Sequence, residues 1–268
     1  MSQQSATGLD KSMLVGGEWV GADDRITVIH PYDSEPVGSV PSASESQVEA
    51  AVDAAAEAVE ASTLSAYERY ELLSATARHV ESRAEEIART LTSEQGKPIT
   101  EARTEVDRAV QTLDMSAEEA KRMFGEYVPM DAQRGFARDH CFTQREPVGV
   151  VAAITPFNFP LNLMVHKVGP ALAAGNAVVG KPASNTPLCG ILLFECLDDA
   201  AAEIDADVPD GLFNVVTGSG STTGDVILEH DAVESISFTG STAVGKYLAN
   251  NSGMKEVTLE LGGNDPTI

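Results

Sequence analysis

The sequence contains little cysteine and histidine, which argues against several kinds of site. Its 268 residues include 3 cysteines, Cys141, Cys189 and Cys196, and no two of them form a close Cys-x-x-Cys pair. An odd count without such a pair supports neither a disulfide framework nor a zinc site. The 5 histidines are scattered and add no metal-binding spacing. We therefore expect no metal centre.

Basic residues are also scarce. The chain has 18 lysines and arginines against 41 aspartates and glutamates, which gives a net charge of -23. Nucleic acid and anionic membrane surfaces repel such a protein, so neither is an expected partner. The acidic residues are spread along the chain rather than gathered in a tail. This dispersed acidity is typical of a halophilic protein, kept soluble in high salt.

Long apolar runs are missing too, although apolar residues make up 43% of the chain and suffice for a sizeable core. No run is long enough to span a bilayer. The first residues, MSQQSATGLDK, lack the basic and then apolar segments of a signal peptide. We therefore expect a cytoplasmic protein.

The segment 148–268 alternates between short apolar strands and helical stretches. The expected strands are VGVVAAI, AVVGKP, LFNVVTG, SISFTG and EVTLELGG, with helical patterns between them. Strict alternation predicts an α/β fold with a doubly wound parallel sheet, whose sites lie at the carboxyl ends of the strands. We interpret 148–268 as a Rossmann-like dinucleotide-binding core.

The segment 1–147 precedes this core and is expected to complete the same domain. Its first forty residues predict short strands and turns. Helices are predicted after Ser44 and after Ser65, because each serine is followed three residues later by Gln or Glu in a capping box. The second helical pattern continues to Gly96, and a third runs from about Thr100 to Phe124. Residues 126–147 predict strands and a crossing connection.

One glycine-rich loop permits three interpretations. Gly240 to Lys246 reads G-x-x-x-x-G-K, close to the phosphate-binding loop of nucleotide hydrolases, but Tyr247 stands where Ser or Thr would hold magnesium. Alternatively, Gly240 and Gly245 only let a helix pack closely on its strand. In the third interpretation, backbone N–H groups at the helix start bind a pyrophosphate without magnesium. The usual dinucleotide fingerprint is absent, because TPFNFP follows the first strand.

Five motifs together resemble the aldehyde dehydrogenase superfamily. They are ITPFNFPLN, GNAVVGKPASNTP, FNVVTG, FTGSTAVG and LELGGN, in the order and spacing of that family. The resemblance also includes GGEWV and QGKP and covers essentially the whole chain. It implies oxidation of an aldehyde to a carboxylic acid with NAD or NADP, through attack by a cysteine thiolate.

The resemblance assigns catalytic roles to two residues. Asn158 matches the side-chain donor of the oxyanion hole, and an amide is chemically suited to stabilise a negative carbonyl oxygen. Without the family, Asn158 would be interpreted as capping the turn before Pro160. Glu260 matches the general base, and its apolar neighbours on the strand favour a raised pKa. Without the family, Glu260 would be an acidic residue on a half-exposed strand.

The resemblance also implies the cofactor-binding residues. Lys181 matches a lysine that contacts the adenosine ribose, and Gly240 and Ser241 match the pyrophosphate loop. Ser184 stands where many NAD-preferring members carry glutamate, which would repel a 2′-phosphate, so we expect NADP to be tolerated. The remaining residues expected to line the cofactor groove are Thr155, Phe157, Gly220 and Phe238.

The nucleophilic cysteine of the family lies beyond the Glu260 motif, whereas this sequence ends at Ile268. Cys189 and Cys196 share one face of a helix and are expected to be buried and inert. We therefore expect an N-terminal fragment that is inactive alone. The alternative is a non-catalytic dinucleotide-binding remnant, although Asn158 and Glu260 serve only chemistry.

Two features of the sequence concern the identity of the aldehyde. The segment from Arg145 to Asn176 resembles branches that act on lactaldehyde, succinate semialdehyde or glyceraldehyde 3-phosphate without phosphorylation. Arg103 and Arg108 are candidates for binding an anionic substrate group, with solvated helix charges as the alternative. By resemblance, the full-length protein is expected to form a homodimer or homotetramer.

Overall fold

The computed structural model describes residues 9–264 and contains one large sheet within that range. Its seven strands follow the order β11-β10-β7-β8-β9-β1-β2. They are β1 (Met13–Val15), β2 (Glu18–Val20), β7 (Val150–Ile154), β8 (Ala177–Lys181), β9 (Phe213–Val215), β10 (Val233–Gly240) and β11 (Glu256–Leu261). Strands β7 to β11 pair in parallel, whereas β1 is antiparallel to both β2 and β9. The predicted α/β fold is confirmed, with an antiparallel edge added by the first two strands.

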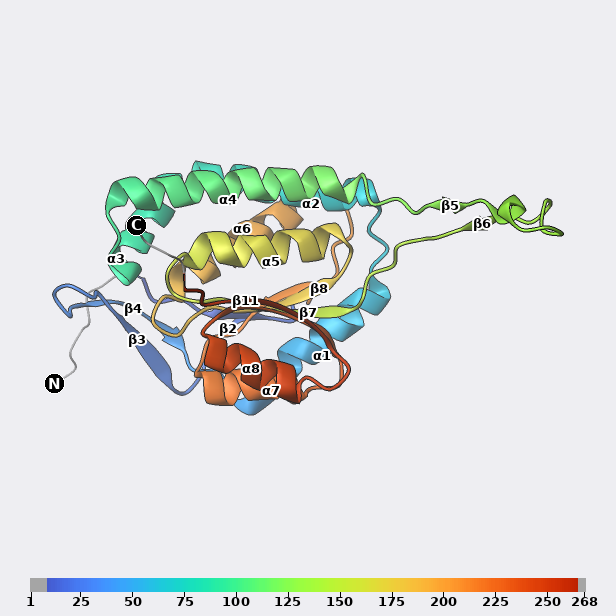
Figure 1. Ribbon diagram of the computed structural model, residues 1–268. Coiled ribbons are helices and arrows are strands. Elements are labelled where there is room, and N and C mark those ends of the chain that lie inside the picture. Colours follow the sequence, from blue (N-terminus) through green and yellow to red (C-terminus); the bar gives the residue numbers. More distant parts are fainter. Residues whose placement is uncertain (1–8, 265–268) are drawn as a thin grey trace.

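Helices cover both faces of this sheet (Figure 1). On one side lie α2 (Ala66–Ser82), α3 (Ala84–Gln95), α4 (Ile99–Ala120), α5 (Pro160–Ala173) and α6 (Leu188–Glu203); on the other lie α1 (Glu45–Ala61), α7 (Asp225–Glu229) and α8 (Thr242–Asn251). Every residue of β7 and β8 is buried, as expected for parallel strands covered on both faces. The buried core therefore lies around the central strands. Strand β11, next to β10, is an edge strand of the sheet.

The predicted helix starts at Ser44 and Ser65 are confirmed, because both serines form complete capping boxes. The continuous helix expected from Ser65 to Gly96 is wrong, since the chain is divided at Arg83 into α2 and α3. The Arg83 backbone leaves helical geometry, with φ -100 and ψ 13. Its guanidinium forms two hydrogen bonds to Glu86, at 2.9 and 3.0 Å, in the first turn of α3. These side-chain contacts stabilise a break that apolar periodicity does not reveal.

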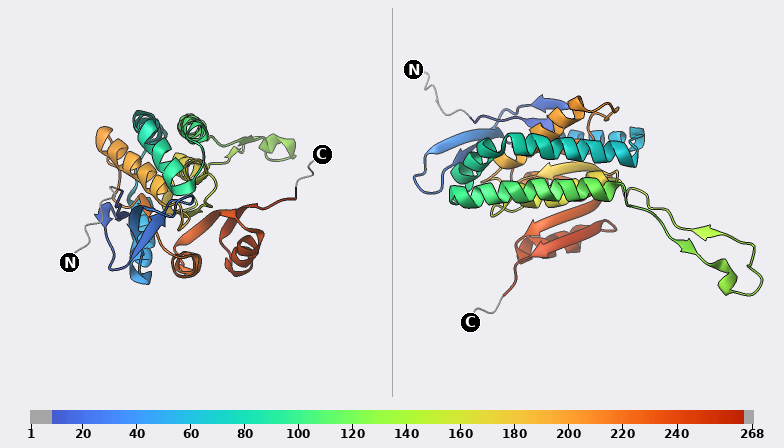
Figure 2. Two further views of the ribbon diagram at one scale, coloured as in Figure 1. Left: turned by 90° about the vertical axis from the view of Figure 1, so that its left-hand side faces the viewer. Right: turned by 90° about the horizontal axis from the view of Figure 1, so that it is seen from above.

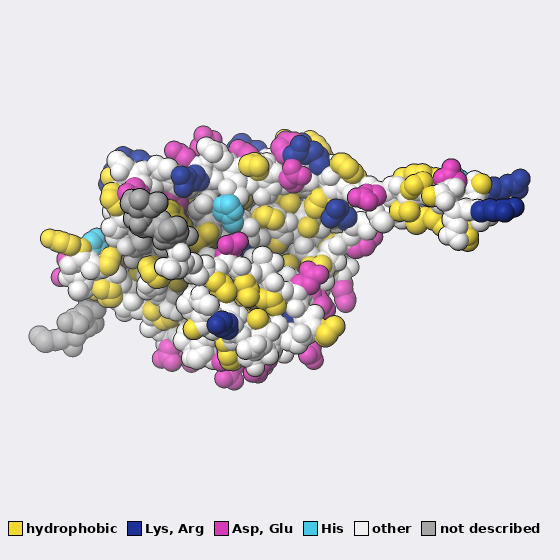
Figure 3. Space-filling model, in the orientation of Figure 1, with side chains coloured by type: hydrophobic (Ala, Val, Ile, Leu, Met, Phe, Trp, Pro, Cys, Tyr) yellow, Lys and Arg dark blue, Asp and Glu magenta, His cyan; other side chains and the backbone are white. Residues whose placement is uncertain are grey.

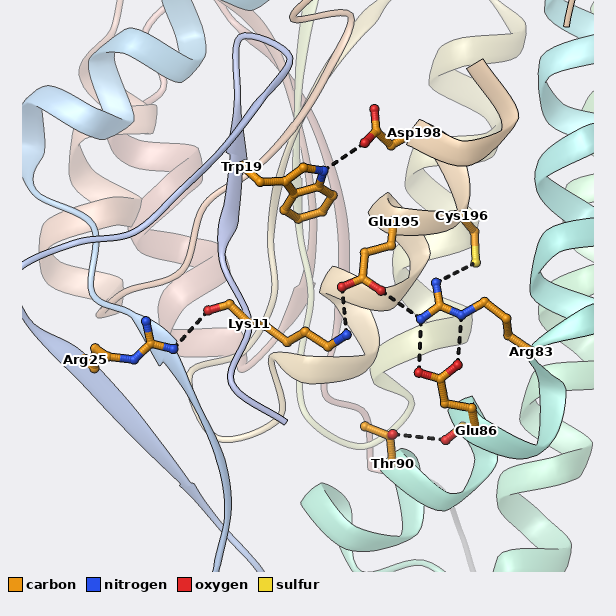
Figure 4. A network of polar contacts seen from close by, with 9 residues as sticks. All are labelled: Lys11, Trp19, Arg25, Arg83, Glu86, Thr90, Glu195, Cys196 and Asp198. Carbon is orange, nitrogen blue, oxygen red and sulfur yellow. Dashed lines mark hydrogen bonds and ion pairs between the residues drawn. The ribbon is translucent and has the colours of Figure 1, made fainter. Parts of the chain in front are cut away.

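A polar network fastens the first strands to the helices (Figure 4). Glu195 on α6 accepts hydrogen bonds from Lys11 and from Arg83, both at 2.7 Å. The indole N–H of Trp19 on β2 donates to Asp198 at 2.8 Å. Residues far apart in the sequence are therefore joined on the side of α6 that faces β1 and β2.

Two smaller strand pairs lie outside the large sheet. Strands β3 (Arg25–Ile29) and β4 (Pro36–Pro41) form one hairpin, and β5 (Tyr127–Val128) and β6 (Cys141–Phe142) form the other. The second pair belongs to an arm that projects from the body between α4 and β7 (Figures 1 and 2). Strands were predicted in this segment and are found there. The arm exposes aromatic side chains, and basic side chains gather at its tip (Figure 3).

Within the described range, no helix is both long enough and apolar enough to cross a membrane. The same range holds no group of three or more histidine, cysteine or acidic side chains arranged to bind a metal ion.

Candidate functional site

The carboxyl ends of four parallel strands, β7, β8, β10 and β11, lie side by side because their registers align. Ile154 at the end of β7 pairs with Lys181 on β8 and with Phe238 on β10. On β10 and β11, Thr239 is paired with Glu260. Parallel strands end on the same side of a sheet, so the loops that follow them form a common surface. This surface carries two neighbouring hollows.

The first hollow is a cavity of about 190 Å³ between the strand ends, α7 and α8. Its lining includes four of the residues expected to bind a cofactor: Thr155, Lys181, Gly220 and Phe238. The Thr155 hydroxyl is buried and has no hydrogen-bond partner within the described residues. Unpartnered polar groups in a cavity favour a ligand that satisfies them. The apolar wall opposite is formed by α8, through Val244 and Leu248.

Lys181 is the buried cation of this cavity, which Asp225 at the start of α7 also lines. It lies at the end of β8 with 6% of its surface exposed, and no carboxylate in residues 9–264 forms an ion pair with it. Burial lowers the pKa of the Lys181 ammonium to about 8, because the charged form loses hydration. A buried cation that forms no ion pair is suited to hydroxyl oxygens or to an anionic ligand.

The second hollow, of about 340 Å³, brings together residues from three loops. Asn158 and Phe157 come from the loop after β7, Gly240 and Ser241 from the loop after β10, and Glu260 from the end of β11. The two hollows adjoin because Thr155 and Phe238 line the first, while their chain neighbours line the second. Both proposed catalytic residues therefore lie beside the cavity that holds Lys181.

Asn158 is exposed in the loop that leads from β7 into α5. Its side-chain amide has no hydrogen-bond partner among the residues that the structure describes, whereas its backbone carbonyl accepts a hydrogen bond from Lys97 at 2.9 Å. The expectation that Asn158 caps the turn before Pro160 receives no support, because no cap bond from its side chain is found. The amide N–H groups remain available to a ligand oxygen.

Glu260 is exposed, which agrees with the alternative of an acidic residue on a half-exposed strand. Strand β11 alternates, so Leu259 and Leu261 are partly buried while Thr258 and Glu260 point to the opposite face. In the described chain that opposite face of the strand carries no covering element, so Glu260 is accessible to water.

Lys167 is a site residue that the sequence analysis missed. It comes from α5, has 7% of its surface exposed, and donates a hydrogen bond of 2.8 Å to the Thr239 hydroxyl. Burial lowers the pKa of Lys167 to about 8, and the nearby Glu260 carboxylate opposes that shift. The signal that could have identified Lys167 is its position within the apolar stretch LNLMVHKVGPALAAG, because lysine is seldom buried.

The loop after β10 lacks the lysine placement of a magnesium-dependent hydrolase loop. Ser241 caps α8 by accepting a hydrogen bond from the Val244 backbone at 3.3 Å. Lys246 is exposed on α8 and lines neither hollow. It is therefore not placed to bind a phosphate there, which argues against a magnesium-dependent hydrolase loop. Gly245 packs closely, because a Cβ there would lie 2.3 Å from Leu261. Gly245 therefore has a packing role, and the same helix begins with its N-terminus at the second hollow, beside Gly240 and Ser241.

Three other expected positions lie away from the hollows. Ser184 donates a hydrogen bond to the Gly218 carbonyl at 2.7 Å and lines neither of them. Arg103 forms an ion pair with Glu85, which favours the solvated-charge interpretation over substrate binding. Arg108 is exposed on α4.

The cysteines lie outside both hollows as well. Cys189 and Cys196 are buried in α6, and burial raises the pKa of the Cys196 thiol to about 12 and that of Cys189 well above its ordinary value. Both thiols are therefore protonated at neutral pH, as expected of inert cysteines. Cys141 belongs to β6 in the arm.

Comparison with known proteins agrees with this geometry. The aldehyde dehydrogenase family model matches residues 19–268. The chain belongs to the aldehyde dehydrogenase family.

Two named relatives are enzymes acting on small aldehydes. A 3-sulfolactaldehyde dehydrogenase of Priestia megaterium is 45% identical over 96% of this chain and 52% of its own length. A lactaldehyde dehydrogenase of Methanocaldococcus jannaschii is 39% identical over 96% of this chain and 54% of its own length. The chain thus spans about half the length of these relatives.

Solved structures show the same fold. The NADP-dependent glyceraldehyde-3-phosphate dehydrogenase of Bacillus halodurans, complexed with NADP, is 39% identical with a TM-score of 0.91, over 96% of this chain and 54% of that one. An NAD-dependent aldehyde dehydrogenase of Sinorhizobium meliloti is 36% identical with a TM-score of 0.89, over 96% and 51%. Relatives of this chain therefore include both NADP-dependent and NAD-dependent enzymes.

Proposed function

We propose that this chain provides the cofactor-binding part of an enzyme that oxidises an aldehyde to a carboxylic acid with NAD or NADP. The observation that carries the proposal is the second hollow, where Asn158 and Glu260 lie together beside the start of α8. In the proposed reaction, Asn158 and Glu260 act in different steps. Asn158 comes from the loop after β7 and Glu260 from the end of β11, and the fold brings both to one hollow.

The residues of the first cavity fit a dinucleotide. Lys181 supplies a buried cation for the adenosine ribose, and the unpartnered Thr155 hydroxyl supplies a further polar contact. The wall formed by Val244 and Leu248 suits a flat apolar ring. The backbone at Gly240 and Ser241, at the N-terminus of α8, would bind the pyrophosphate. When bound, the cofactor supplies a hydride acceptor, the oxidised nicotinamide ring.

The second hollow supplies the proton and charge chemistry. The Asn158 amide would donate a hydrogen bond to the aldehyde oxygen as negative charge develops on it. Glu260 would remove a proton from the water that releases the acid product. Lys167, which donates a hydrogen bond to the Thr239 hydroxyl beside Glu260, would place a positive charge near that carboxylate.

The proposal requires a thiol nucleophile from another segment, because none of the three cysteines of this sequence lies in either hollow. We therefore propose that the 268-residue chain alone does not oxidise aldehydes. The same observation supports the alternative function, a non-catalytic dinucleotide-binding protein. Aldehyde oxidation by the full-length natural protein separates the two.

The substrate we propose is a small aldehyde with a hydroxyl group on the neighbouring carbon. Lactaldehyde, 3-sulfolactaldehyde and glyceraldehyde 3-phosphate, named for three relatives, share that feature. Succinate semialdehyde lacks the hydroxyl and serves as the discriminating comparison. A higher kcat/KM for succinate semialdehyde than for lactaldehyde would overturn this choice.

NADP is the cofactor we expect to be accepted, because Ser184 places no carboxylate near the end of β8. Its hydroxyl is already bonded to the Gly218 carbonyl, which leaves a small uncharged side chain. Isothermal titration of the 268-residue chain with NADP and with NAD tests both the cofactor and the preference. Binding of neither nucleotide would contradict the proposed function, and binding of NAD at least about tenfold tighter than NADP would contradict the role of Ser184.

We also propose that the full-length protein assembles as a homodimer or homotetramer. The arm supports this, since Tyr127 and Phe142 are 64% and 74% exposed there. Native mass measured at micromolar concentration tests the proposal, and a monomer would contradict it.

A further inference from the structure

A buried ion pair lies beneath the loop that carries Asn158, and the proposed chemistry does not use it. Lys97 follows Gly96 in the turn between α3 and α4, and Glu105 lies on α4. Their side chains are 6% and 0% exposed and form an ion pair with each other. Removing two charges from water is costly, so a pair this deeply buried needs further hydrogen bonds to be stable.

Those further contacts all go to one short segment, residues 158–162. The Lys97 ammonium donates to the Asn158 backbone carbonyl at 2.9 Å and lies 4.3 Å from the centre of the Phe159 ring. The free oxygen of Glu105 accepts hydrogen bonds from the backbone N–H groups of Leu161 and Asn162, at 3.0 and 3.1 Å. The pair therefore holds both the carbonyl before α5 and the first amides within it.

The start of α5 has no cap of its own. Phe159 occupies the N-cap position and makes no side-chain cap hydrogen bond, so the first amides of the helix need a partner from elsewhere. Glu105 provides that partner from α4. Its negative charge also suits the positive end of the helix dipole, and Lys97 balances the charge.

We infer that Lys97 and Glu105 are positioning residues for Asn158. This inference rests on the proposed function, because it assigns to the pair the placement of the oxyanion donor. Asn158 stands in an exposed loop with a side chain that has no partner in the described range, so only its backbone can fix where its amide points. The anchors on the carbonyl of Asn158 and on the N–H groups of Leu161 and Asn162 hold that backbone. Small displacements of such a donor reduce catalysis strongly.

A second carboxylate in the same helical layer offers a matched control. Glu94 at the end of α3 accepts hydrogen bonds from the Leu188 and Cys189 backbone N–H groups, at 2.7 and 2.9 Å, and caps α6. It is 2% exposed and, within the described residues, forms no hydrogen bond with residues 158–162. Loss of Glu94 therefore removes a cap of the same kind without touching the Asn158 loop.

The first test follows the Asn158 side chain directly in the 268-residue chain. Its amide signal in a ¹H–¹⁵N NMR spectrum is assigned by its disappearance in Asn158→Asp. In Glu105→Gln and in Lys97→Met we expect this signal to shift or broaden, and hydrogen exchange at Leu161 and Asn162 to accelerate about tenfold or more. In Glu94→Gln the exchange of Leu188 and Cys189 should accelerate while the Asn158 signal stays unchanged.

Lys97→Met leaves Glu105 charged and unpaired, which threatens folding. The double variant Lys97→Met/Glu105→Gln removes both charges together and retains an amide that caps α5, so it isolates the loss of the Asn158 anchor. An unchanged Asn158 signal in folded Lys97→Met or in the double variant overturns the inference. Faster exchange at Leu161 and Asn162 with an unmoved Asn158 amide would do the same, since the pair would then be only a helix cap.

The second test is kinetic and uses the full-length protein. Glu105→Gln should lower kcat about tenfold or more with the KM for the cofactor unchanged, and should add little to the loss in Asn158→Ala. A fall in kcat that is fully additive with Asn158→Ala contradicts positioning. Absence of aldehyde oxidation in the wild-type protein contradicts the proposed function instead, and the NMR test then still decides whether the pair orients Asn158.

Discussion

The two hollows differ in how the fold encloses them. The cavity beside Lys181 lies at the ends of fully buried central strands, and this lysine is 6% exposed. The hollow beside Glu260 lies at the edge of the sheet, where β11 alternates between partly buried and exposed residues. A cation that binds nucleotide oxygens gains from burial, because a low dielectric strengthens its interactions. A base that activates water must meet water. The comparison shows that neighbouring strand ends of one sheet can place one charged residue, Lys181, in the interior and another, Glu260, in contact with water.

The largest expected effect concerns the pH dependence of stability at Lys181. Its pKa in the folded chain is about 8, against an ordinary value of 10.5, so between these values the unfolded chain binds more protons. The free energy of unfolding should therefore rise with pH across this window, by on the order of 3 kcal/mol from this residue. Urea unfolding across the window measures the slope. Lys181→Met should reduce this slope and leave the part due to Lys167, whose pKa burial also lowers to about 8. Lys246→Met, which changes an exposed lysine, should leave the slope unchanged.

Nucleotide affinity is the next way to separate the two hollows. Lys181→Met should raise the dissociation constant for NADP by about 10–100-fold, since a charge-assisted hydrogen bond from a buried cation is lost. Glu260→Gln should leave that constant nearly unchanged, because Glu260 is assigned to the activation of water and to none of the nucleotide contacts. Calorimetric titration of both variants measures the contrast. Equal losses in the two variants would contradict this division of roles.

A smaller effect is expected from Ser184, which follows β8 three residues after Lys181 and lines neither hollow. Ser184→Glu should shift the ratio of NADP to NAD dissociation constants about tenfold in favour of NAD, because the new carboxylate repels a 2′-phosphate. Ser184→Ala is the control, since it also removes the hydrogen bond to the Gly218 carbonyl but adds no charge. An equal change in both variants would attribute the effect to the lost hydrogen bond.

The smallest effect is expected far from both hollows, in the network of Figure 4. Lys11 pairs with Glu195, and their side chains are 16% and 24% exposed. Lys11→Met should lower the free energy of unfolding by at most about 1 kcal/mol, because partly exposed ion pairs contribute little. NADP affinity should not change. A measurable loss of affinity would mean that the N-terminal strands influence the strand ends.

Much of the fold was predictable because its signals are local. Capping boxes at Ser44 and Ser65 marked two helix starts, and alternating apolar strands and helices predicted the parallel sheet. The break at Arg83 was not predictable, since it depends on contacts with Glu86 and with Glu195 on a distant helix.

The candidate site divides in the same way. Motifs identified Asn158, Lys181 and Glu260, and the structure brings them to the carboxyl ends of the parallel strands. Lys167 was missed because its partner, the Thr239 hydroxyl, is 72 residues away in the sequence. For Glu260 the structure agrees with the half-exposed strand that the sequence also allowed, because the alternation of β11 turns that residue away from its partly buried apolar neighbours.

By itself, the sequence determined the alternation of strands and helices, the caps of α1 and α2, the strong negative charge and the motifs of the aldehyde dehydrogenase family. These properties depend on residues close together in the chain. Only the tertiary structure decided which side chains are buried and which meet. The Lys97–Glu105 pair shows the reason, because its charges are stable in the interior only through bonds to a loop more than fifty residues away.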